Sequence, residues 1–473
     1  MLSTQTRSAF CAAHNRKSLM LKLARLAVLA AFFSLMSLHS TGYSADQARP
    51  NVLIIVADDL GYGDLGFQGG KDVPTPHLNR LAQGGTRCTN GYVNCPVCSP
   101  TRAALVTGRY QQRFGHEFNP GQQQDQEARA NFGLPTTEVT IADQFKKAGY
   151  HTGQVGKWHL GFNKKFQPLQ RGFDESFCFL GGAHPYFPPE NGGKSGIFRN
   201  GEEIQEPEYL TDAFGREGAS YIERNASKPF FLLLTFNAVH NPQDAQKEKL
   251  EQFKDISDSK RRSYAAMLSS MDDAVGRVLS QLNQSAVAQN TLIFFISDNG
   301  GPTNANGSQN SPLNGVKATV WEGGIRVPFV VSWPGVIPAN ATYEKPVIAH
   351  DIFATASAAI GAGLPEGRVI DSVNLLPYLK GENASSPHEA LFWRFGEQQA
   401  VRKGNFKLLR LRDGNEHLFD LSKDIGEKND LLAEYPDIAK QLRADFETWN
   451  AQLVSPLWKQ GGGRQARQQA RTQ

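Results

Sequence analysis

Residues 98–109, with the sequence CSPTRAALVTGR, are the part of this chain that most directly suggests chemistry. Ser99 is a good helix N-cap and Pro100 suits the first helical position, so Cys98 is expected just outside a helix N-terminus. Free backbone N–H groups and the helix dipole favour an anion there, which Arg102 would support. The same field lowers the pKa of a cysteine thiol and makes it reactive. The alternative is an ordinary helix start with a half-buried cysteine.

Polar oxygen-bearing side chains follow two apolar runs that are typical of buried strands: Asp58 and Asp59 after residues 51–57, and Asp298 and Asn299 after residues 291–296. Adjacent carboxylates raise each other's pKa unless a cation lies between them. In α/β sheets, sites form beyond the carboxyl ends of the strands. An all-oxygen ligand set favours a hard divalent metal such as calcium. Solvated acids in an exposed turn are the alternative.

Residues 98–102 resemble the signature of the type I, formylglycine-dependent sulfatases, an arylsulfatase-like family of the alkaline phosphatase superfamily. In that family the motif cysteine is oxidised to formylglycine, and the modifying enzyme needs the cysteine, the proline and the arginine, here Cys98, Pro100 and Arg102. The resemblance implies that the hydrated aldehyde at position 98, and not a thiol, attacks sulfur. It also implies one calcium ion per chain, held by Asp58, Asp59, Asp298, Asn299 and the modified Cys98.

Three further motifs match the same family pattern: Lys157 and His159 in GKWHLG (156–161), His240 before Asn-Pro, and Lys317 ahead of WEGGIRVP (321–328). A single lysine or histidine after a strand is usually structural or solvated, and only their shared order with residues 98–102 points to catalysis. The resemblance implies these roles: Lys157 and Lys317 neutralise the transferring sulfonyl group, His240 protonates the leaving oxygen, Asp298 is the base, and Arg102 and His159 hold and deprotonate the hydrate.

Strands and helices alternate through most of the chain, which predicts an α/β sheet with helices on both sides. Buried strands are expected at residues 51–57, 230–236, 291–296 and 327–331, with helices starting at Thr75-Pro76, over residues 141–148 and over residues 264–282. The resemblance implies the alkaline-phosphatase-like version of this fold, in which the sheet is mixed but mostly parallel.

The predicted secondary structure changes near residue 390, from alternating strands and helices to short consecutive strands. Short strands are expected at residues 391–394, 399–402 and 406–411, and a helix at 435–453, which matches a smaller C-terminal antiparallel-sheet subdomain. The predicted organisation is therefore a signal peptide (1–44), a catalytic α/β domain (45–385), a C-terminal α+β subdomain (386–458) and a disordered tail (459–473).

The first 44 residues carry five basic residues and no acid, and residues 26–38 form an apolar run. This is typical of a secretory signal peptide cleaved near Ser44 or Ala45, with an uncleaved anchor as the alternative. The remaining chain has 45 basic and 46 acidic residues, a formal charge of −1. Neither this charge nor any motif indicates a nucleic acid partner. The protein is expected to be secreted or periplasmic, with no membrane contact after cleavage.

The expected activity is hydrolysis of sulfate monoesters on sulfated carbohydrate, after maturation by a formylglycine-generating or sulfatase-maturating enzyme. Cys88 and Cys95 either pair in an oxidising compartment or are buried free thiols. One rival function is a phosphatase or phosphonate monoesterase, although the sequence lacks the extra His/Asp cluster that two zinc ions need. The other is a calcium-bound, non-catalytic glycan-binding protein, which would be expected to have lost Cys98, Lys157 or His240.

Overall fold

The computed structural model describes residues 49–460 except 122–125 and 191. The predicted signal peptide and nearly all of the predicted tail lie outside these residues. Within them, no helix combines the length and the apolar character that crossing a bilayer requires. The four described cysteines, Cys88, Cys95, Cys98 and Cys178, are all buried free thiols, which decides the question left open for Cys88 and Cys95.

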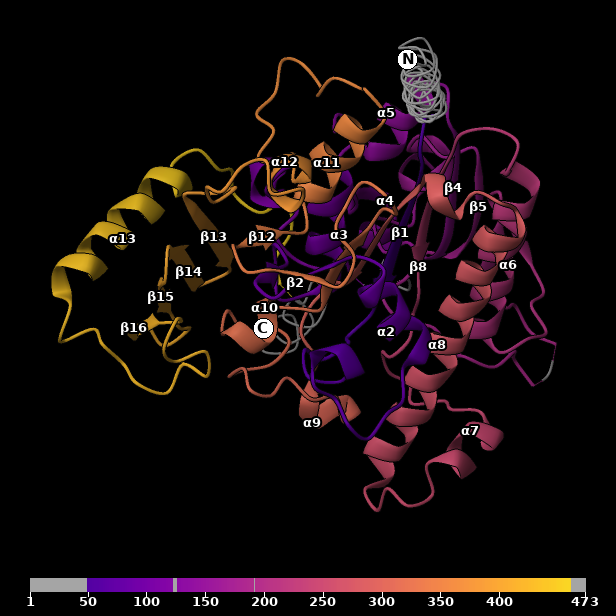
Figure 1. Cartoon of the computed structure of the whole chain (residues 1–473), viewed down its shortest axis with the longest axis horizontal. Coiled ribbons are helices and arrows are strands. Elements are labelled where there is room, and N and C mark those ends of the chain that lie inside the picture. The colour runs from indigo at the N-terminus through magenta and orange to yellow at the C-terminus, as the bar shows by residue number, and fades with distance from the viewer. Residues whose placement is uncertain (1–48, 122–125, 191, 461–473) are drawn as a thin grey trace, which may run out of the picture. The chain divides into compact units, whose positions relative to one another are not determined.

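A ten-stranded sheet runs through the larger part of the molecule, in the order β11-β2-β10-β9-β1-β8-β4-β5-β6-β7 (Figure 1). The strands β9, β1, β8, β4 and β5 are parallel, and β10 joins β9 antiparallel. The ten strands are β1 (Asn51–Ala57), β2 (Thr86–Cys88), β4 (His151–Lys157), β5 (Glu175–Phe179), β6 (Ile197–Arg199), β7 (Glu202–Ile204), β8 (Phe230–Thr235), β9 (Thr291–Ser297), β10 (Phe329–Ser332) and β11 (Ala341–Tyr343).

Helices cover both faces of this sheet. Alternate residues of β1 enter two separate apolar cores, with Val52, Ile54 and Val56 in one core and Leu53 and Ile55 in the other. The first core is closed by α3 (Cys98–Thr107), α5 (Ile141–Lys147) and α11 (Asp351–Ala359), and the second by α2 (Pro76–Gln83), α6 (Leu210–Asn225) and α8 (Ser259–Gln284). Burial on both faces explains why the central strands are continuous apolar runs.

Shorter helices lie in the connections. They are α4 (Gln126–Asn131), α7 (Lys247–Gln252), α9 (Thr303–Asn306), α10 (Glu322–Ile325) and α12 (Leu376–Leu379), with 3-10 turns at Gly66–Gln68, Gln111–Phe114, Lys164–Phe166, Pro168–Gln170 and Ala288–Asn290. A two-stranded sheet pairs β3 (Gly91–Tyr92) with β12 (Val347–Ile348).

The C-terminal part forms a separate four-stranded antiparallel sheet with α13 (Pro436–Asn450) packed on it, drawn in brown and yellow in Figure 1. Its strands are β13 (Ala390–Phe395), β14 (Gln398–Lys403), β15 (Phe406–Arg410) and β16 (Glu416–Asp420). The predicted fold class, a mixed and mostly parallel sheet between helices with a smaller antiparallel sheet, is confirmed.

Nine of the sixteen strands in the described residues were not predicted from the sequence: β2 to β7, β11, β12 and β16. The β16 segment and the β5 segment are short, and β4 is rich in glycine and polar residues, so none stands out as an apolar run. The predicted strand at 327–331 is shifted, because Val327 and Pro328 precede β10. The structure therefore adds β4 beside β8 and β5 beside β4, and β4 ends at Lys157 of the GKWHLG motif.

Candidate active site

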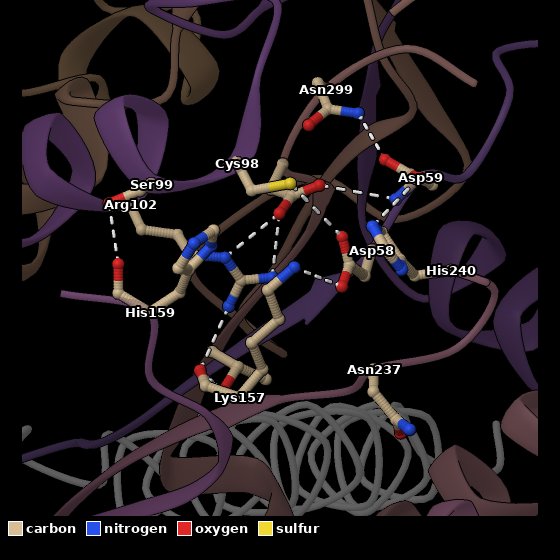
Figure 2. A network of polar contacts seen from close by, with 12 residues as sticks. Asp58, Asp59, Cys98, Ser99, Arg102, Lys157, His159, Asn237, His240 and Asn299 are labelled. Atoms are coloured by element: carbon tan, nitrogen blue, oxygen red, sulfur yellow. Dashed lines mark hydrogen bonds and ion pairs between the residues drawn. The ribbon is translucent and has the colours of Figure 1, made fainter. Parts of the chain in front are cut away.

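The carboxyl ends of four neighbouring parallel strands bring the predicted polar residues to one edge of the sheet (Figure 2). β1 ends directly before Asp58, β9 before Asp298, and β4 at Lys157. β8 leads into the loop that carries His240. These strands are adjacent in the sheet, so side chains that are up to 240 residues apart in the sequence lie within contact distance, as between Asp59 and Asn299.

Helix α3 carries Cys98 into this edge, and it begins two residues earlier than the sequence predicts. Val97 is the N-cap, with φ −141° and ψ 157°, and Cys98 is already in the first turn. The expectation that Ser99 caps the helix is wrong. Its hydroxyl donates instead to the carbonyl of His159 at 2.6 Å and lies 2.7 Å from Nε2 of His116, so tertiary contacts use the group that local capping would need.

The Cys98 thiol is surrounded by charged groups of both signs. It donates a long hydrogen bond to Asp58 Oδ1 at 3.7 Å, and Lys317 Nζ lies 3.4 Å from its sulfur. Burial raises its pKa to about 12, because the two lysines nearby do not outweigh desolvation. The expectation of a lowered thiol pKa is therefore wrong, and the unmodified cysteine is neutral and weakly nucleophilic near neutral pH.

Two lysines each form an ion pair with one of the adjacent carboxylates of Asp58 and Asp59. The Lys157 ammonium is fully buried and donates to Asp58 Oδ2 at 2.5 Å, and Lys317 donates to Asp59 Oδ1 at 2.6 Å. Burial by itself would raise the pKa of Asp58, but Lys157 and the neighbouring cations lower it well below its usual value. Nε2 of His240, one-fifth exposed, lies 3.6 Å from Asp59 Oδ2.

Arg102 is bound to Asp298 and not to Cys98. Its Nε and Nη2 donate to Asp298 Oδ2 at 3.0 and 2.8 Å, and its Nη1 donates to the carbonyl of Lys157 at 3.1 Å. Burial and the nearby Asp58 raise the pKa of Asp298. Arg102 therefore fixes the orientation of Asp298 and links the ends of β9 and β4. These contacts differ from the expected one, in which Arg102 contacts the hydrate at position 98.

The ring of His159 lies at the same site with a free nitrogen. Its Nδ1 is buried and has no hydrogen-bond partner in the part of the chain that the structure describes. Its backbone has a φ of 56°, which is uncommon outside glycine. Burial and the charge of Lys157 lower its pKa well below the usual value, so the ring is neutral. A neutral imidazole with an unpartnered nitrogen can accept a proton from a group placed beside it, or donate one to that group.

The carboxylate and amide oxygens fit a hard divalent cation. Ligand atoms of Asp58, Asp59, Cys98 and His240 lie within 4.8 Å of one another. The side-chain carbonyl oxygen of Asn299 is buried and none of the described residues donates to it, while its amide nitrogen donates to Asp59 Oδ1 at 2.7 Å. A buried oxygen without a donor is costly unless an ion or water satisfies it. The oxygen donors of this set match the preference of calcium.

Comparison with known proteins identifies the family of the chain. The family described as Sulfatase matches residues 50–362. The chain belongs to the sulfatase family. It is 34% identical to an arylsulfatase of Hemicentrotus pulcherrimus, over 88% of this chain and 84% of that protein, and 32% identical to human N-acetylgalactosamine-6-sulfatase, over 87% and 88%. This sulfatase is thus a sulfuric ester hydrolase.

Solved structures agree with the fold of this sulfatase. The crystal structure of Ps i-CgsB in complex with k-i-k-neocarrahexaose superposes with a TM-score of 0.83 at 34% identity, covering 90% of this chain and 98% of that chain. A PsFucS1 sulfatase from Pseudoalteromonas sp. gives a TM-score of 0.74 at 24% identity, covering 85% and 90%. The first supports the family and the fold, and the second the fold alone.

Sequence reasoning missed three residues of this sulfatase that lie around the site. His116 contacts Ser99, and the Tyr186 hydroxyl donates to the carbonyls of Asn237 and His240. The side-chain amide of Asn237 is buried, and neither of its polar atoms has a partner within the described ranges. None of them lies in a catalytic or metal-binding motif of the sequence. The one signal that could have marked Asn237 and Tyr186 as site residues is their position near the His240 loop, and that position is known only from the folded structure.

Proposed function

We propose that this sulfatase is an exported enzyme that removes sulfate from a sulfated polysaccharide, using a formylglycine made from Cys98 and one bound calcium ion. The observation that carries the proposal is the surroundings of the Cys98 side chain. It lies in the first turn of α3 between Asp58 and Lys317, and its raised pKa makes the thiol a poor nucleophile at neutral pH. A modified side chain at this position supplies the nucleophile that the thiol lacks.

The calcium would be held by the oxygens of Asp58, Asp59, Asp298 and Asn299, together with an oxygen of the formylglycine. When bound, it supplies positive charge that stabilises the anionic sulfate ester and the deprotonated hydrate. The buried carboxylates and the unpartnered Asn299 oxygen are the support for this site in the chain itself.

The side chains around position 98 then divide the remaining work. The ammonium groups of Lys157 and Lys317 stabilise charge that develops on the sulfonyl oxygens. Asp298, oriented by two donors of Arg102, takes the proton from the hydroxyl of the hydrate that attacks sulfur.

His240 is the group that delivers a proton to the leaving alcohol oxygen, because it is the most exposed histidine at the site. His159, with its free Nδ1, takes the proton of the second hydroxyl of the hydrate. Loss of that proton lets the C–O bond to the sulfate break, which releases sulfate and restores the aldehyde. The cycle consumes one water, which rehydrates the aldehyde.

The substrate class rests on the surface near His240 and on one solved relative. Phe187 is 45% exposed, packs against Tyr209, and follows Tyr186, which is hydrogen-bonded to the His240 carbonyl. An exposed aromatic ring at this place can stack on a sugar ring. The structural relative Ps i-CgsB was solved with a hexaose. The basic, apolar leader of the sequence supports export to the periplasm or the exterior.

The experiment that tests the nucleophile is the mass of the peptide containing Cys98, from protein made with a formylglycine-generating enzyme. Conversion of the thiol to the aldehyde lowers the mass by about 18 Da. The peptide containing Cys178, another buried thiol, is the internal control and is expected to keep its mass. An unmodified Cys98 in a protein that still releases sulfate would overturn the formylglycine assignment.

A second measurement separates the sulfatase from the phosphoryl-transfer rival. Sulfate release from sulfated oligosaccharides and from an aryl sulfate is compared with hydrolysis of the matching aryl phosphate and phosphonate ester. We expect the sulfate esters to be preferred and sulfated oligosaccharides to compete with the aryl sulfate. Preference for the phosphonate ester would replace this proposal with the rival function.

A further inference from the structure

A second cluster of metal-ligand side chains lies away from the candidate active site. It consists of His350 and Asp351 at the start of α11 and His388 in the segment between α12 and β13 (Figure 1). One ligand atom from each residue lies within 4.8 Å of the others. His350 and Asp351 are fully buried, and His388 is about one-tenth exposed, which gives the cluster a route to solvent.

Asp351 is hydrogen-bonded to His388 and lies close to His350. His388 Nε2 lies 2.8 and 2.9 Å from the two carboxylate oxygens, and His350 Nε2 lies 3.7 Å from one of them. The backbone N–H groups of Ile348 and Val373 donate to the same carboxylate at 2.9 Å. These backbone donors fix the orientation of the carboxylate. Its hydrogen bond with His388 is the contact that a cation bound between the two side chains can replace.

The Nε2 atom of His350 is the observation that points to a ligand. It is buried, has no hydrogen-bond partner among the described residues and faces Asp351, although a buried polar atom is normally satisfied. The other ring nitrogen, Nδ1, lies 2.7 Å from the side-chain amide of Asn94, whose oxygen is itself unpartnered. With the amide turned over, Asn94 Oδ1 accepts from Nδ1–H and leaves Nε2 free to bind a metal, an outer-shell arrangement common for metal-bound histidines.

We propose that His350, Asp351 and His388 form a zinc site, separate from the oxygen-rich site at the sheet edge. Two imidazole nitrogens and one carboxylate are a zinc ligand set, and water completes the fourth position. Bound zinc joins the start of α11 to the segment that leads into the four-stranded sheet. Its role is to stabilise that connection, and the proposal does not depend on the nucleophile or the substrate of the enzyme.

Zinc binding to the full chain tests this proposal when the oxygen-rich site is kept filled with excess calcium. Equilibrium dialysis with elemental analysis is expected to give one zinc per chain. Cobalt(II) in place of zinc is expected to give the strong visible absorption of a four-coordinate nitrogen and oxygen site. Zinc is also expected to raise the melting temperature, because the preformed site binds it more tightly than the unfolded chain does.

The decisive variant is His388→Gln, which keeps a donor for Asp351 but removes the imidazole ligand. It is expected to lose the bound zinc, the cobalt spectrum and the zinc-dependent rise in melting temperature. His151→Gln is the matched control, because His151 also lies 2.7 Å from a carboxylate, that of Glu175, yet belongs to none of the three-ligand groups found in the described residues. His388→Ala repeats the test if the first variant does not fold. Zinc binding that is absent in the wild type, or retained in a folded His388 variant, overturns the proposal.

Discussion

The active site and the junction between α10 and the four-stranded sheet both bury several charged side chains, but they satisfy them differently. At the junction, the Lys407 ammonium is fully buried between Glu322 and Glu427, at 2.9 and 2.8 Å. Tyr92 donates to Glu322 at 2.7 Å, and Glu427 accepts the backbone N–H of Glu322 at the same distance. No member of this junction cluster, all of it described, has an unpartnered buried polar atom.

The active site has the opposite character. Asn299 and His159 each keep a buried polar atom without a partner, and His240 and Lys317 are partly open to solvent. A closed, satisfied set of charges fixes one arrangement of two structural parts, whereas an unsatisfied and partly open set has capacity left for a ligand. The difference separates a structural cluster from a functional one more clearly than burial or charge count does.

The sharpest test of the functional side is Cys98→Ala. Turnover of an aryl sulfate is expected to fall by roughly a thousandfold or more, because the nucleophile is removed. The fold is expected to survive, since the polar contacts of the thiol with Asp58 and Lys317 are long. Cys178→Ala, at a buried thiol in β5, is the matched control and is expected to keep kcat while losing some stability. Equal activity losses in the two variants would contradict the assignment.

On the structural side, Lys407→Met leaves Glu322 and Glu427 without their shared cation. The free energy of unfolding, measured with urea, is expected to drop by about 3–5 kcal/mol, as for other broken buried ion pairs. kcat of the folded variant is expected to change little. Lys403→Met is the control, since that lysine is one-third exposed beside Glu389 and Asp445 and is expected to cost less than about 1 kcal/mol. A Lys407 variant that kept full stability would remove the contrast between the clusters.

A smaller effect on the functional side is expected from Asp298→Asn. Loss of one charge at a site with two donors from Arg102 should lower kcat/KM by about 100-fold and weaken calcium binding. Calorimetric calcium titration and steady-state kinetics check both effects. Asp272→Asn is the control, because that buried carboxylate accepts the backbone N–H groups of His77 and Leu78 and is not one of the proposed calcium ligands. Unchanged calcium affinity in Asp298→Asn would exclude it as a ligand.

The junction cluster also predicts a pH dependence of stability. Burial, with the nearby charge of Glu322, raises the pKa of Glu427 from 4.5 to about 7. The folded state therefore keeps a proton that the unfolded chain releases, and stability falls as the pH rises through this range. The loss is on the order of 1–3 kcal/mol between about pH 4.5 and 7. Urea unfolding of the wild type should show this slope, and Glu427→Gln, which cannot ionise, should flatten it. An equal slope in both proteins would assign the effect to other groups.

Much of the site was predictable because it is carried by local sequence. An apolar strand followed directly by Asp58, or by Asp298 and Asn299, places these residues at a sheet edge whatever the rest of the chain does. The order of the motifs along the chain also predicted the family. The strand that presents Lys157 was not predicted, because β4 has Gly153 and Gly156 where an apolar run would have side chains. Both glycines allow neighbouring residues to approach the strand closely. A side chain at Gly153 would meet the Tyr221 ring, and one at Gly156 would meet the carbonyl of Thr235.

The sequence by itself determined which chemical groups are present and which strand ends carry them, since backbone periodicity and motif order are local properties. The tertiary structure decided how those groups act on one another. It brought Arg102 into an ion pair with Asp298 and the Ser99 hydroxyl into a hydrogen bond with His159 in place of the helix N-terminus. It also raised the pKa of Cys98, where the sequence predicted a lowered one. These outcomes depend on desolvation and on charges brought from distant segments, and such interactions exist only after the strands have come together.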